Sequence, residues 1–221
     1  MASGAKARFS RSVPRRLMSD PVRQLAATLQ ESGPDERIAL LRAHLAHPPE
    51  TRSDYDLNPG MRTEAPPVES LTPAAVLVPI VGHEESPTVL LTKRTDHLRD
   101  HAGQVSFPGG RVEVVDDGPH DTALRETDEE IGLHRDHIEI VGQLADYETR
   151  TGFHVTPIVG YVRPGFDLKL DRFEVAAAFE IPLDFVLDPR NHQKRSRMWK
   201  GAERHYYAME YDDYLVWGAT A

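Results

Sequence analysis

The run Arg125-Glu126-Thr127-Asp128-Glu129-Glu130-Ile131-Gly132-Leu133 begins a short distance after Pro108-Gly109-Gly110 and carries most of the information in this chain. In a helix, Glu126, Glu129 and Glu130 stand at i, i+3 and i+4, so their carboxylates project from one face. Like charges held this close repel one another, and a divalent cation coordinated by the carboxylates offsets that repulsion. Hard oxygen ligands suit Mg²⁺ or Mn²⁺. The run therefore predicts a metal site, and the alternative is a solvated acidic helix face.

The helix that carries these glutamates is expected to span residues 119–131. Pro119 suits the first helical position after Gly118, and Gly132 is a natural C-terminal cap. The face opposite the glutamates is expected to pack on the core and holds three residues: Leu124, Thr127 and Ile131.

The composition excludes several classes of function. The chain has 221 residues, 28% of them charged and none of them cysteine, which rules out disulfides, zinc-thiolate sites and thiol nucleophiles. The net charge of -9 argues against non-specific binding to nucleic acid but allows a small anionic substrate at a metal site. No apolar stretch approaches the length that spans a bilayer. We therefore expect a cytoplasmic protein with a small-molecule substrate and neither a nucleic-acid nor a membrane partner.

The first 70 residues divide into two parts. Residues 1–19 are basic and precede the first acid, Asp20, which indicates either an organelle transit peptide or, as we favour, a disordered tail, since no amphipathic stripe is evident. Residues 20–70 are expected to form two helices, at 21–30 and 34–47, followed by a polar linker or extended arm at 50–70.

A third part, residues 71–221, is expected to form the main domain. Its apolar periodicity predicts strands at 74–81, 88–93, 104–107, 138–147, 154–162, 175–181, 204–210 and 214–217, and a short helix at 183–187. Strands with few interspersed helices imply an α/β fold, in which a mixed sheet packs between helices. Whether a further helix follows residue 221 stays open.

The glutamate run and its glycine resemble a Nudix box, the signature of hydrolases that cleave a nucleoside diphosphate linked to another group. The general box runs Gly, five residues, Glu, seven residues, Arg-Glu-apolar-x-Glu-Glu-x-Gly-apolar. Here it is carried by Gly110, Arg125-Glu126, Glu129-Glu130 and Gly132. The resemblance implies a Nudix-like α/β/α sandwich with a mixed central β-sheet, preceded by short N-terminal helices.

This chain departs from the general box in three places. Asp116 stands where the first Glu belongs, eight residues rather than seven lead to Arg125, and Thr127 fills the first apolar position. A strict count of seven would select Asp117 but would place Arg111 at the glycine position, so we prefer Asp116.

With these departures, the box is similar to that of the subgroup of Nudix enzymes that hydrolyse coenzyme A. That subgroup carries an upstream motif: Leu-Leu-Thr-x-Arg, an Arg, three residues, Gly, three residues, Phe-Pro-Gly-Gly. This chain matches it completely, with Leu90-Leu91-Thr92-Lys93-Arg94, Arg99, Gly103 and Phe107-Pro108-Gly109-Gly110. The resemblance implies hydrolysis of coenzyme A or its thioesters to 3′,5′-ADP and 4′-phosphopantetheine or its acyl form.

The resemblance also implies roles for individual residues. Mg²⁺ or Mn²⁺ would be held by Glu126, Glu129, Glu130 and the backbone carbonyl of Gly110. Arg125, four residues before Glu129, would brace it as an ion pair, or would form only a surface salt bridge.

The general base stays open between Glu126 and Glu174. Arg94 and Arg99 would contact substrate phosphates, because a guanidinium matches phosphate oxygens bidentately; the alternative for both is surface solvation and ion pairing.

Two other functions stay open. One is a Nudix diphosphatase for ADP-ribose, NADH or another nucleoside diphosphate derivative, which the upstream motif disfavours. The other is a Nudix-fold binding module without catalysis, which the three intact helix carboxylates disfavour. A homodimer is also left open, with the N-terminal helices either capping the core or forming the dimer contact.

Overall fold

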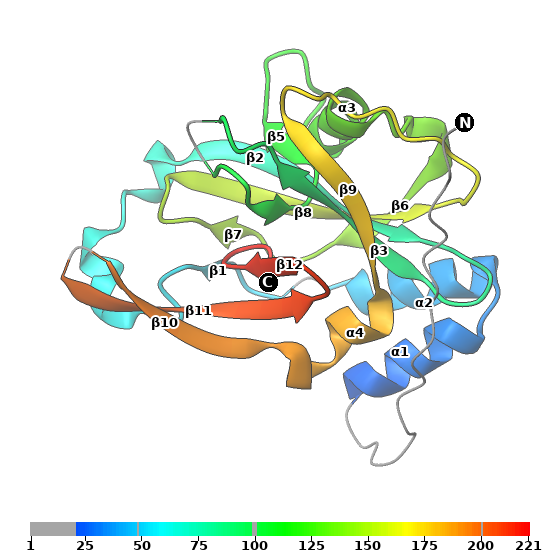
Figure 1. The fold of residues 1–221 in the computed structure, drawn as a ribbon, viewed down its shortest axis with the longest axis horizontal. Helices are drawn as coiled ribbons and strands as arrows, with labels where there is room; N and C mark the ends of the chain where they lie inside the picture. The colour runs from blue at the N-terminus through cyan, green and yellow to red at the C-terminus, as the bar shows by residue number, and fades with distance from the viewer. Residues whose placement is uncertain (1–20, 48, 99–100, 200) are drawn as a thin grey trace.

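The computed structural model describes residues 21–47, 49–98, 101–199 and 201–221 (Figure 1). The basic tail at 1–19 lies outside the described residues. Helices α1 (Pro21–Glu31) and α2 (Pro34–Leu45) come first, close to the two helices that the sequence predicts. Among the described helices, none is long and apolar enough to cross a membrane.

A nine-stranded mixed sheet forms the centre of the molecule. Its two long strands, β2 (Thr72–Val81) and β8 (Phe153–Val162), run parallel and pair along their whole length. Strand β3 (Thr88–Arg94) lies antiparallel between β2 and β9 (Val175–Pro182), and β6 (Ile138–Gln143) lies antiparallel to β8. The short strands β1 (Arg52–Ser53), β4 (Val105–Ser106), β5 (Gly109–Arg111) and β7 (Tyr147–Glu148) extend these edges. The unbroken apolar run of β2 fits a strand that is covered on both faces.

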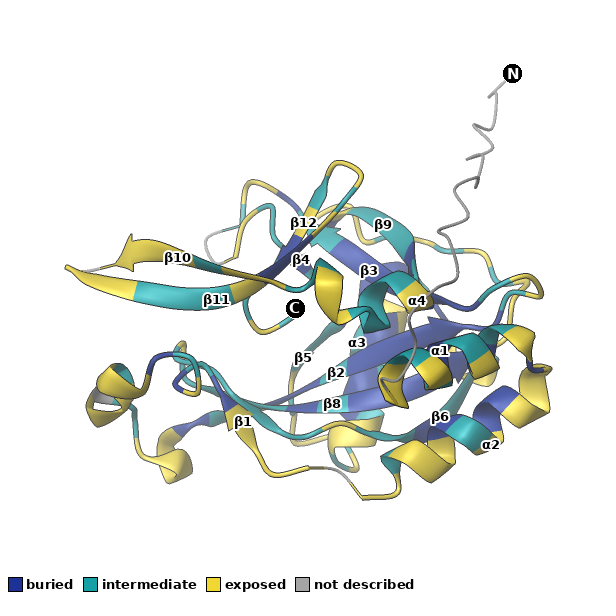
Figure 2. Ribbon diagram, turned by 90° about the horizontal axis from the view of Figure 1, so that it is seen from below, coloured by how far each residue is buried: buried dark blue, intermediate teal, exposed yellow. Residues whose placement is uncertain are grey.

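The two faces of the sheet have different cover. Helix α3 (Pro119–Ile131) lies on one face, where Ala123 packs against Leu77 and Ile158. The other face carries α1, α2, α4 (Leu183–Leu187) and a second sheet of β10 (Gln193–Trp199), β11 (Ala202–Tyr211) and β12 (Tyr214–Trp217). Buried residues concentrate in β2, β3 and β8 between these layers (Figure 2). The predicted α/β/α arrangement with a mixed sheet is therefore confirmed.

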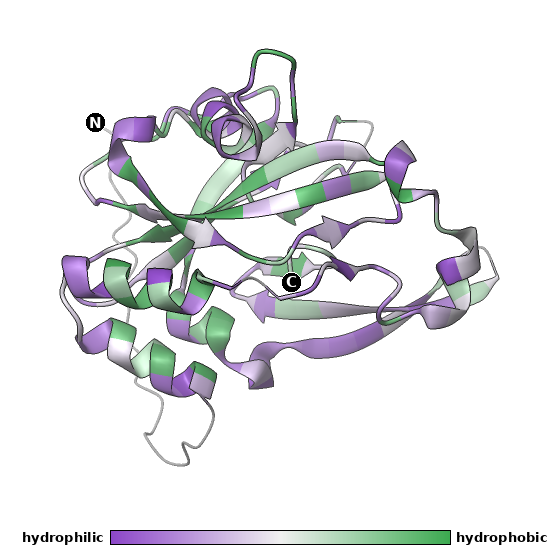
Figure 3. Cartoon of the chain, turned by 180° about the vertical axis from the view of Figure 1, so that it is seen from behind, coloured by the Kyte–Doolittle hydropathy of each residue, from purple (hydrophilic) through white to green (hydrophobic). Residues whose placement is uncertain are grey.

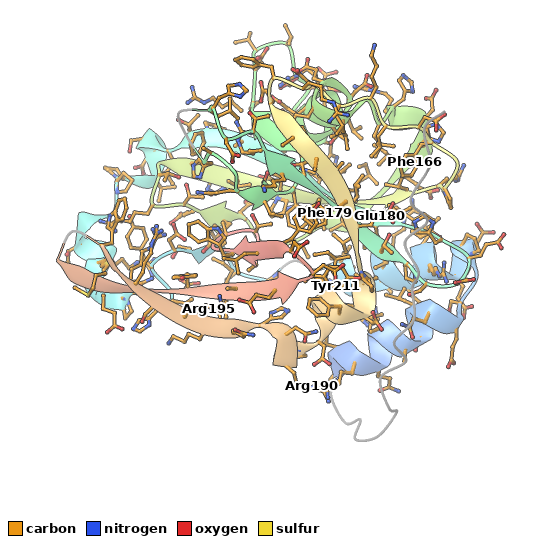
Figure 4. The ribbon with its side chains drawn as sticks, in the orientation of Figure 1. Phe166, Phe179, Glu180, Arg190, Arg195 and Tyr211 are labelled. Atoms are coloured by element: carbon orange, nitrogen blue, oxygen red, sulfur yellow. The ribbon has the colours of Figure 1, made fainter. Side chains whose placement is uncertain are left out.

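Aromatic side chains join the two sheets. Phe179 on β9 stacks on Tyr214 at 3.5 Å between ring centroids, and Phe185 meets Tyr211 edge to face at 5.0 Å. Figure 4 shows Phe179 and Tyr211 on their strands. Tyr211 and Tyr214 thus pack within the fold, whereas Tyr207 of β11 is exposed.

Strand β10 is one element that the sequence pattern does not predict. It reads Gln193-Lys194-Arg195-Ser196-Arg197-Met198-Trp199 and is hydrophilic along most of its length (Figure 3). It pairs with β11 on one side and forms the edge of its sheet. Charged side chains suit an edge strand, and they remove the alternation by which a strand is recognised.

The predicted arm at 50–70 is docked on the domain. Strand β1 pairs in parallel with β7, and short 3₁₀ helices follow at Pro59–Glu64 and Val68–Ser70. The Asp54 carboxylate accepts hydrogen bonds from the Tyr147 hydroxyl at 3.1 Å, the Arg150 amide at 2.9 Å and the Arg204 guanidinium at 2.9 Å. Burial, together with the Asp54 charge, raises the pKa of Tyr147. These contacts order the arm even though its sequence has no periodicity.

The single strand predicted at 138–147 is split. Its register against β8 shifts between Ile140 and Gly142, and regular pairing of β6 ends at Gln143 before β7 begins. Gly142 adopts φ 155°, and a Cβ there would lie 2.6 Å from the Cβ of Leu45. A glycine is needed where α2 approaches the sheet this closely.

Arg37 joins the N-terminal helices to the sheet. Only 2% exposed, it donates hydrogen bonds to the carbonyls of Leu29 and His83, both at 2.7 Å, and makes longer ones to Gln30 and Glu84. The guanidinium thereby links the end of α1 to the turn between β2 and β3. Helices α1 and α2 also bury Leu29, Ile38 and Leu41 in the same cluster as the sheet.

We expect Arg37→Ala to lower the free energy of unfolding by about 2–4 kcal/mol, because buried carbonyls lose their donor and a cavity remains. Arg42→Ala is the matched control on the same helix. Its side chain is 52% exposed and pairs with Glu139, so its removal should cost about 0.5 kcal/mol. Urea unfolding of the two variants measures the difference, and equal losses would contradict the role of Arg37.

Candidate active site

Helix α3 has the boundaries that its sequence signals predict. Pro119 follows Gly118 at φ 110°, and Gly132 ends the helix at φ 67° with its amide donating to the Asp128 carbonyl at 2.8 Å. Thr127 and Ile131 are buried against the core, as expected for the face opposite the glutamates, whereas Leu124 is only half-buried and Ala123 is buried beside it. The helix therefore fixes the backbone position of each of the three glutamates.

Two glycines bring the chain close to this helix. Gly109 adopts φ 152°, and a Cβ there would lie 2.3 Å from the carbonyl oxygen of Ala75. A Cβ at Gly110 would lie 2.4 Å from Oε1 of Glu126. At Gly109 the backbone leaves no room for a larger residue, and at Gly110 a Cβ would displace the Glu126 carboxylate, which lies directly against the glycine backbone.

Asp116 and Arg125 form a bidentate ion pair. Nε of Arg125 donates to Oδ1 of Asp116 at 2.8 Å, and a second guanidinium nitrogen donates to Oδ2 at 3.0 Å. The Asp116 carboxylate also accepts from the Thr122 hydroxyl and the Glu113 amide, both at 2.8 Å, and its side chain is 1% exposed. The Arg125 guanidinium holds the pKa of Asp116 well below its usual range. Asp116, rather than its exposed neighbour Asp117, is thus the acid that ties the loop before α3 to the helix.

Arg125 also contacts two of the three glutamates. Its Nη1 lies 3.0 Å from Oε1 of Glu126 and 3.0 Å from Oε2 of Glu129. The Glu129 side chain is 60% exposed and the Glu126 side chain 18% exposed. Burial raises the pKa of Glu126, and Arg125 partly offsets that rise. The i, i+4 pair of Arg125 and Glu129 that the sequence suggests is therefore present as an ion pair.

Glu130 is the most buried of the three glutamates, at 6% exposed. Its Oε2 accepts a hydrogen bond of 3.3 Å from the Gly109 amide, and its Oε1 lies 3.8 Å from Arg94. Burial raises the pKa of Glu130 to about 8, against the opposing effect of Arg94. These two long contacts leave the charge of a buried carboxylate poorly compensated.

The segment before β9 brings Glu174 to the same place. The Asp171 amide donates to the carbonyl of Glu130 at 2.8 Å, and the Thr95 amide donates to the carbonyl of Glu174 at 2.9 Å. Arg94 lies 3.8 Å from the Glu174 carboxylate as well as 3.8 Å from that of Glu130. Arg94 thus stands between an acid of α3 and an acid of the loop before β9.

The structure gathers most of the residues that the sequence singles out, and their chemical roles stay predictions. Those brought together are Gly110, Arg125, Glu126, Glu130, Arg94 and Glu174. Glu129 lies on the same helix but turns toward Arg125 and solvent, so the three helix carboxylates do not converge as expected, because the nearby guanidinium attracts that side chain. Arg99 lies outside the described residues.

Two contributors could not be read from the sequence pattern. Thr122 donates to Asp116, and Thr95 is buried and donates both its amide and its hydroxyl to the loop that carries Glu174. A threonine one residue after Arg94 carries no signal by itself, since its partners lie nearly 80 residues further along the chain.

The residues present suit a hard divalent cation in their chemistry. Within the described parts of the chain, no three acidic or histidine side chains are already arranged to hold a metal ion. The buried Glu130 carboxylate nevertheless has, among the described residues, one cationic partner at 3.8 Å, Arg94, and Gly110 brings its backbone beside Glu126. Carboxylate and carbonyl oxygens are the ligands that Mg²⁺ and Mn²⁺ prefer.

The raised pKa of Glu130 has a measurable consequence for metal-free protein in EDTA. The unfolded carboxyl loses its proton near pH 4.5, whereas the folded carboxyl keeps it until about pH 8. The folded state therefore binds more protons in this window, and stability from this group is lost as pH rises through it. We expect Glu130→Gln to become progressively more stable than wild type between pH 5 and 8, by about 2–4 kcal/mol at the upper end.

Asp128→Asn controls for the loss of one negative charge, since Asp128 is exposed on the same helix. Urea unfolding at a series of pH values supplies the comparison. If the two variants changed in parallel with pH, the buried state of the Glu130 carboxylate would be contradicted.

Comparison with known proteins gives a consistent result. The family model described as NUDIX domain matches residues 71–199. A relative from Yersinia pestis (strain Pestoides F), described as "Uncharacterized Nudix hydrolase NudL", is 42% identical over 148 residues, which cover 67% of this chain and 74% of that protein.

Similar solved structures include an Ap4A hydrolase of C. elegans, with 21% identity and a TM-score of 0.44 over 53% of this chain and 84% of that chain. A MutT protein from Methanosarcina mazei Go1 has 26% identity and a TM-score of 0.42 over 52% of this chain and 80% of that chain. Because the family model spans more than half of the chain and the Yersinia relative is 42% identical, the chain belongs to the Nudix hydrolase family.

Proposed function

We propose that the chain hydrolyses the pyrophosphate bond of coenzyme A or its thioesters to 3′,5′-ADP and 4′-phosphopantetheine or its acyl form. The observation that carries the proposal is the position of Arg94. This residue ends the Leu-Leu-Thr-x-Arg part of the upstream motif, which is similar to that of coenzyme A hydrolases, and its guanidinium lies 3.8 Å from both Glu130 and Glu174. Arg94, which belongs to the motif of this subgroup, therefore adjoins Glu130 of the Nudix box and Glu174 of the loop before β9.

The upstream motif forms one folded unit. Leu90 and Leu91 are buried in β3, and the Thr92 hydroxyl donates to the carbonyl of Ser106 at 3.2 Å. Gly103 adopts φ 67°, and a Cβ there would lie 2.6 Å from Oδ1 of Asp96. A motif built in this way holds Arg94 at one end and the two glycines of the box at the other.

Residues near the end of the described chain pack against the same motif. The Thr220 hydroxyl donates to the Val105 carbonyl at 3.2 Å, and the Gly218 amide donates to the Tyr207 carbonyl at 3.0 Å. The segment 217–221, which also resembles this subgroup, thus packs beside the strand that leads into Phe107-Pro108-Gly109-Gly110.

Metal binding is assigned to Glu126, Glu129, Glu130 and the Gly110 carbonyl. A bound Mg²⁺ or Mn²⁺ supplies charge neutralisation at the phosphates and lowers the pKa of water. The Glu129 carboxylate would have to break its ion pair with Arg125 to bind the metal. The Glu130 carboxylate, whose contact with Arg94 is long, would gain a close positive charge. Arg125 is assigned a positioning role, because its contacts are with Asp116 and the glutamates.

The reaction needs a base and a countercharge for the phosphates. We assign the base to Glu174, because among the described residues its carboxylate forms one ion pair, the 3.8 Å contact to Arg94, whereas Glu126 is held by Arg125 at 3.0 Å. Water attacks one phosphorus, its proton passes to the Glu174 carboxylate, and the other phosphate leaves with the bridging oxygen. Arg94 then neutralises phosphate oxygens.

The substrate assignment is tested by separating the products from coenzyme A, acetyl-coenzyme A, ADP-ribose, NADH and dGTP. We expect coenzyme A or its thioester to be cleaved fastest, with Mg²⁺ or Mn²⁺ required and EDTA inhibitory. Glu130→Gln should lower kcat by about 10³-fold or more while circular dichroism stays unchanged. Faster cleavage of ADP-ribose or NADH would redirect the assignment within the family, and binding without turnover would indicate a non-catalytic module.

Arg94 is tested by Arg94→Ala and Arg94→Lys. A guanidinium that neutralises phosphate in the transition state should be worth about 10²–10³-fold in kcat/KM, and lysine should restore only part of it. Arg163→Ala removes an exposed arginine that pairs with Glu139 and serves as the control. Near-normal activity of Arg94→Ala would remove Arg94 from the reaction and leave it a structural partner of the two acids.

A further inference from the structure

Phe173 is a large apolar side chain left in solvent beside the candidate active site. It is 65% exposed and immediately precedes Glu174, in the turn that leads into β9. A single exposed apolar side chain is common on protein surfaces, and this one is distinguished by its place next to Glu174. Figure 1 shows the start of β9 next to α3, the helix that carries the glutamates.

The backbone of Phe173 is held firmly on both sides. Its amide donates to Oδ1 of Asp171 at 2.8 Å, and its carbonyl accepts from the hydroxyl of Thr95 at 2.8 Å. The next residue, Glu174, accepts from the Thr95 amide at 2.9 Å. Residues 173–174 therefore run beside Arg94 and Thr95, and Phe173 is exposed on an ordered loop.

His97 completes a small aromatic pair. Its ring centroid lies 4.8 Å from that of Phe173 with 62° between the planes, an edge-to-face arrangement. Such a contact restrains the phenyl ring and leaves it largely accessible. In sequence, His97 lies three residues after Arg94, and Phe173 directly precedes Glu174.

We propose that Phe173, restrained by His97, is a stacking platform for the purine base of the substrate. The inference rests on the proposed function only in taking the substrate to be an adenine nucleotide with a diphosphate. Phe173 directly precedes Glu174, and Thr95, the residue after Arg94, donates to the carbonyls of both, so the backbone of Phe173 lies beside the residues assigned to the phosphates. Stacking on an exposed aromatic ring recognises the π-face of a base without hydrogen bonds, as in single-strand nucleic-acid sites.

The experiment measures binding of the two products separately. Isothermal titration calorimetry with 3′,5′-ADP and with 4′-phosphopantetheine is carried out on wild type, Phe173→Ala, Phe173→Trp and Met198→Ala. Met198 is 68% exposed on β10, so its variant controls for the loss of an exposed apolar side chain.

We expect Phe173→Ala to weaken 3′,5′-ADP binding by about tenfold and to leave 4′-phosphopantetheine binding unchanged. Phe173→Trp should restore or tighten the nucleotide, and Met198→Ala should change neither ligand. Unchanged affinity of Phe173→Ala for 3′,5′-ADP would overturn the proposal. So would a loss confined to 4′-phosphopantetheine, or a changed oligomeric state with nucleotide binding intact, which would mark Phe173 as a protein contact.

Failure of the proposed function gives a different result. If wild type does not cleave coenzyme A, calorimetry is repeated with ADP and ADP-ribose, which share the adenine base. Weaker binding of these by Phe173→Ala would retain the platform and reject coenzyme A as substrate. Absence of adenine-nucleotide binding by wild type would overturn the platform.

Discussion

The pairing of Arg125 with Asp116 is the interaction on which the rest of the site depends. It joins the loop after β5 to the second turn of α3 through two short hydrogen bonds, and the aspartate is 1% exposed. The same guanidinium reaches Glu126 and Glu129, so one side chain sets the positions of an acid in the loop and two acids on the helix. A planar, always charged group with several donors can do this, whereas a lysine ammonium lacks the fork geometry.

The site buries a carboxyl group whose ionised form water cannot screen. Glu130 is buried with one long hydrogen bond and one distant guanidinium, and burial raises its pKa to about 8. Such a group is costly to the fold unless a cation joins it, which is the arrangement expected of a site whose function outweighs local stability. The fold sustains this cost through the continuous core on both faces of the central sheet.

Elements far apart in sequence meet at this site. Arg94 comes from the end of β3, the box glycines lie at 109–110, the helix acids at 126–130, and Glu174 comes from the turn before β9. Hydrogen bonds from Thr95 and Asp171 hold the last of these against the others. The same hydrogen bonds hold Phe173 in its exposed position beside Arg94 and Glu174. The proposed base-binding residue and the proposed catalytic residue therefore lie on one short loop.

The sequence by itself determined the helix at 119–131, its glycine cap, the buried strands at 74–81 and 88–93 and the mixed sheet, because these follow from local propensity and apolar periodicity. It also marked Gly110 and the glutamates, since their spacing is a property of the chain. Tertiary structure alone decided that Glu129 faces Arg125, that Arg94 stands between Glu130 and Glu174, that Arg37 is buried, and that the polar segment 193–199 is an edge strand. Those outcomes depend on partners between 4 and about 80 residues away, and the direction of a side chain is set by which charges and carbonyls surround it once the layers have packed.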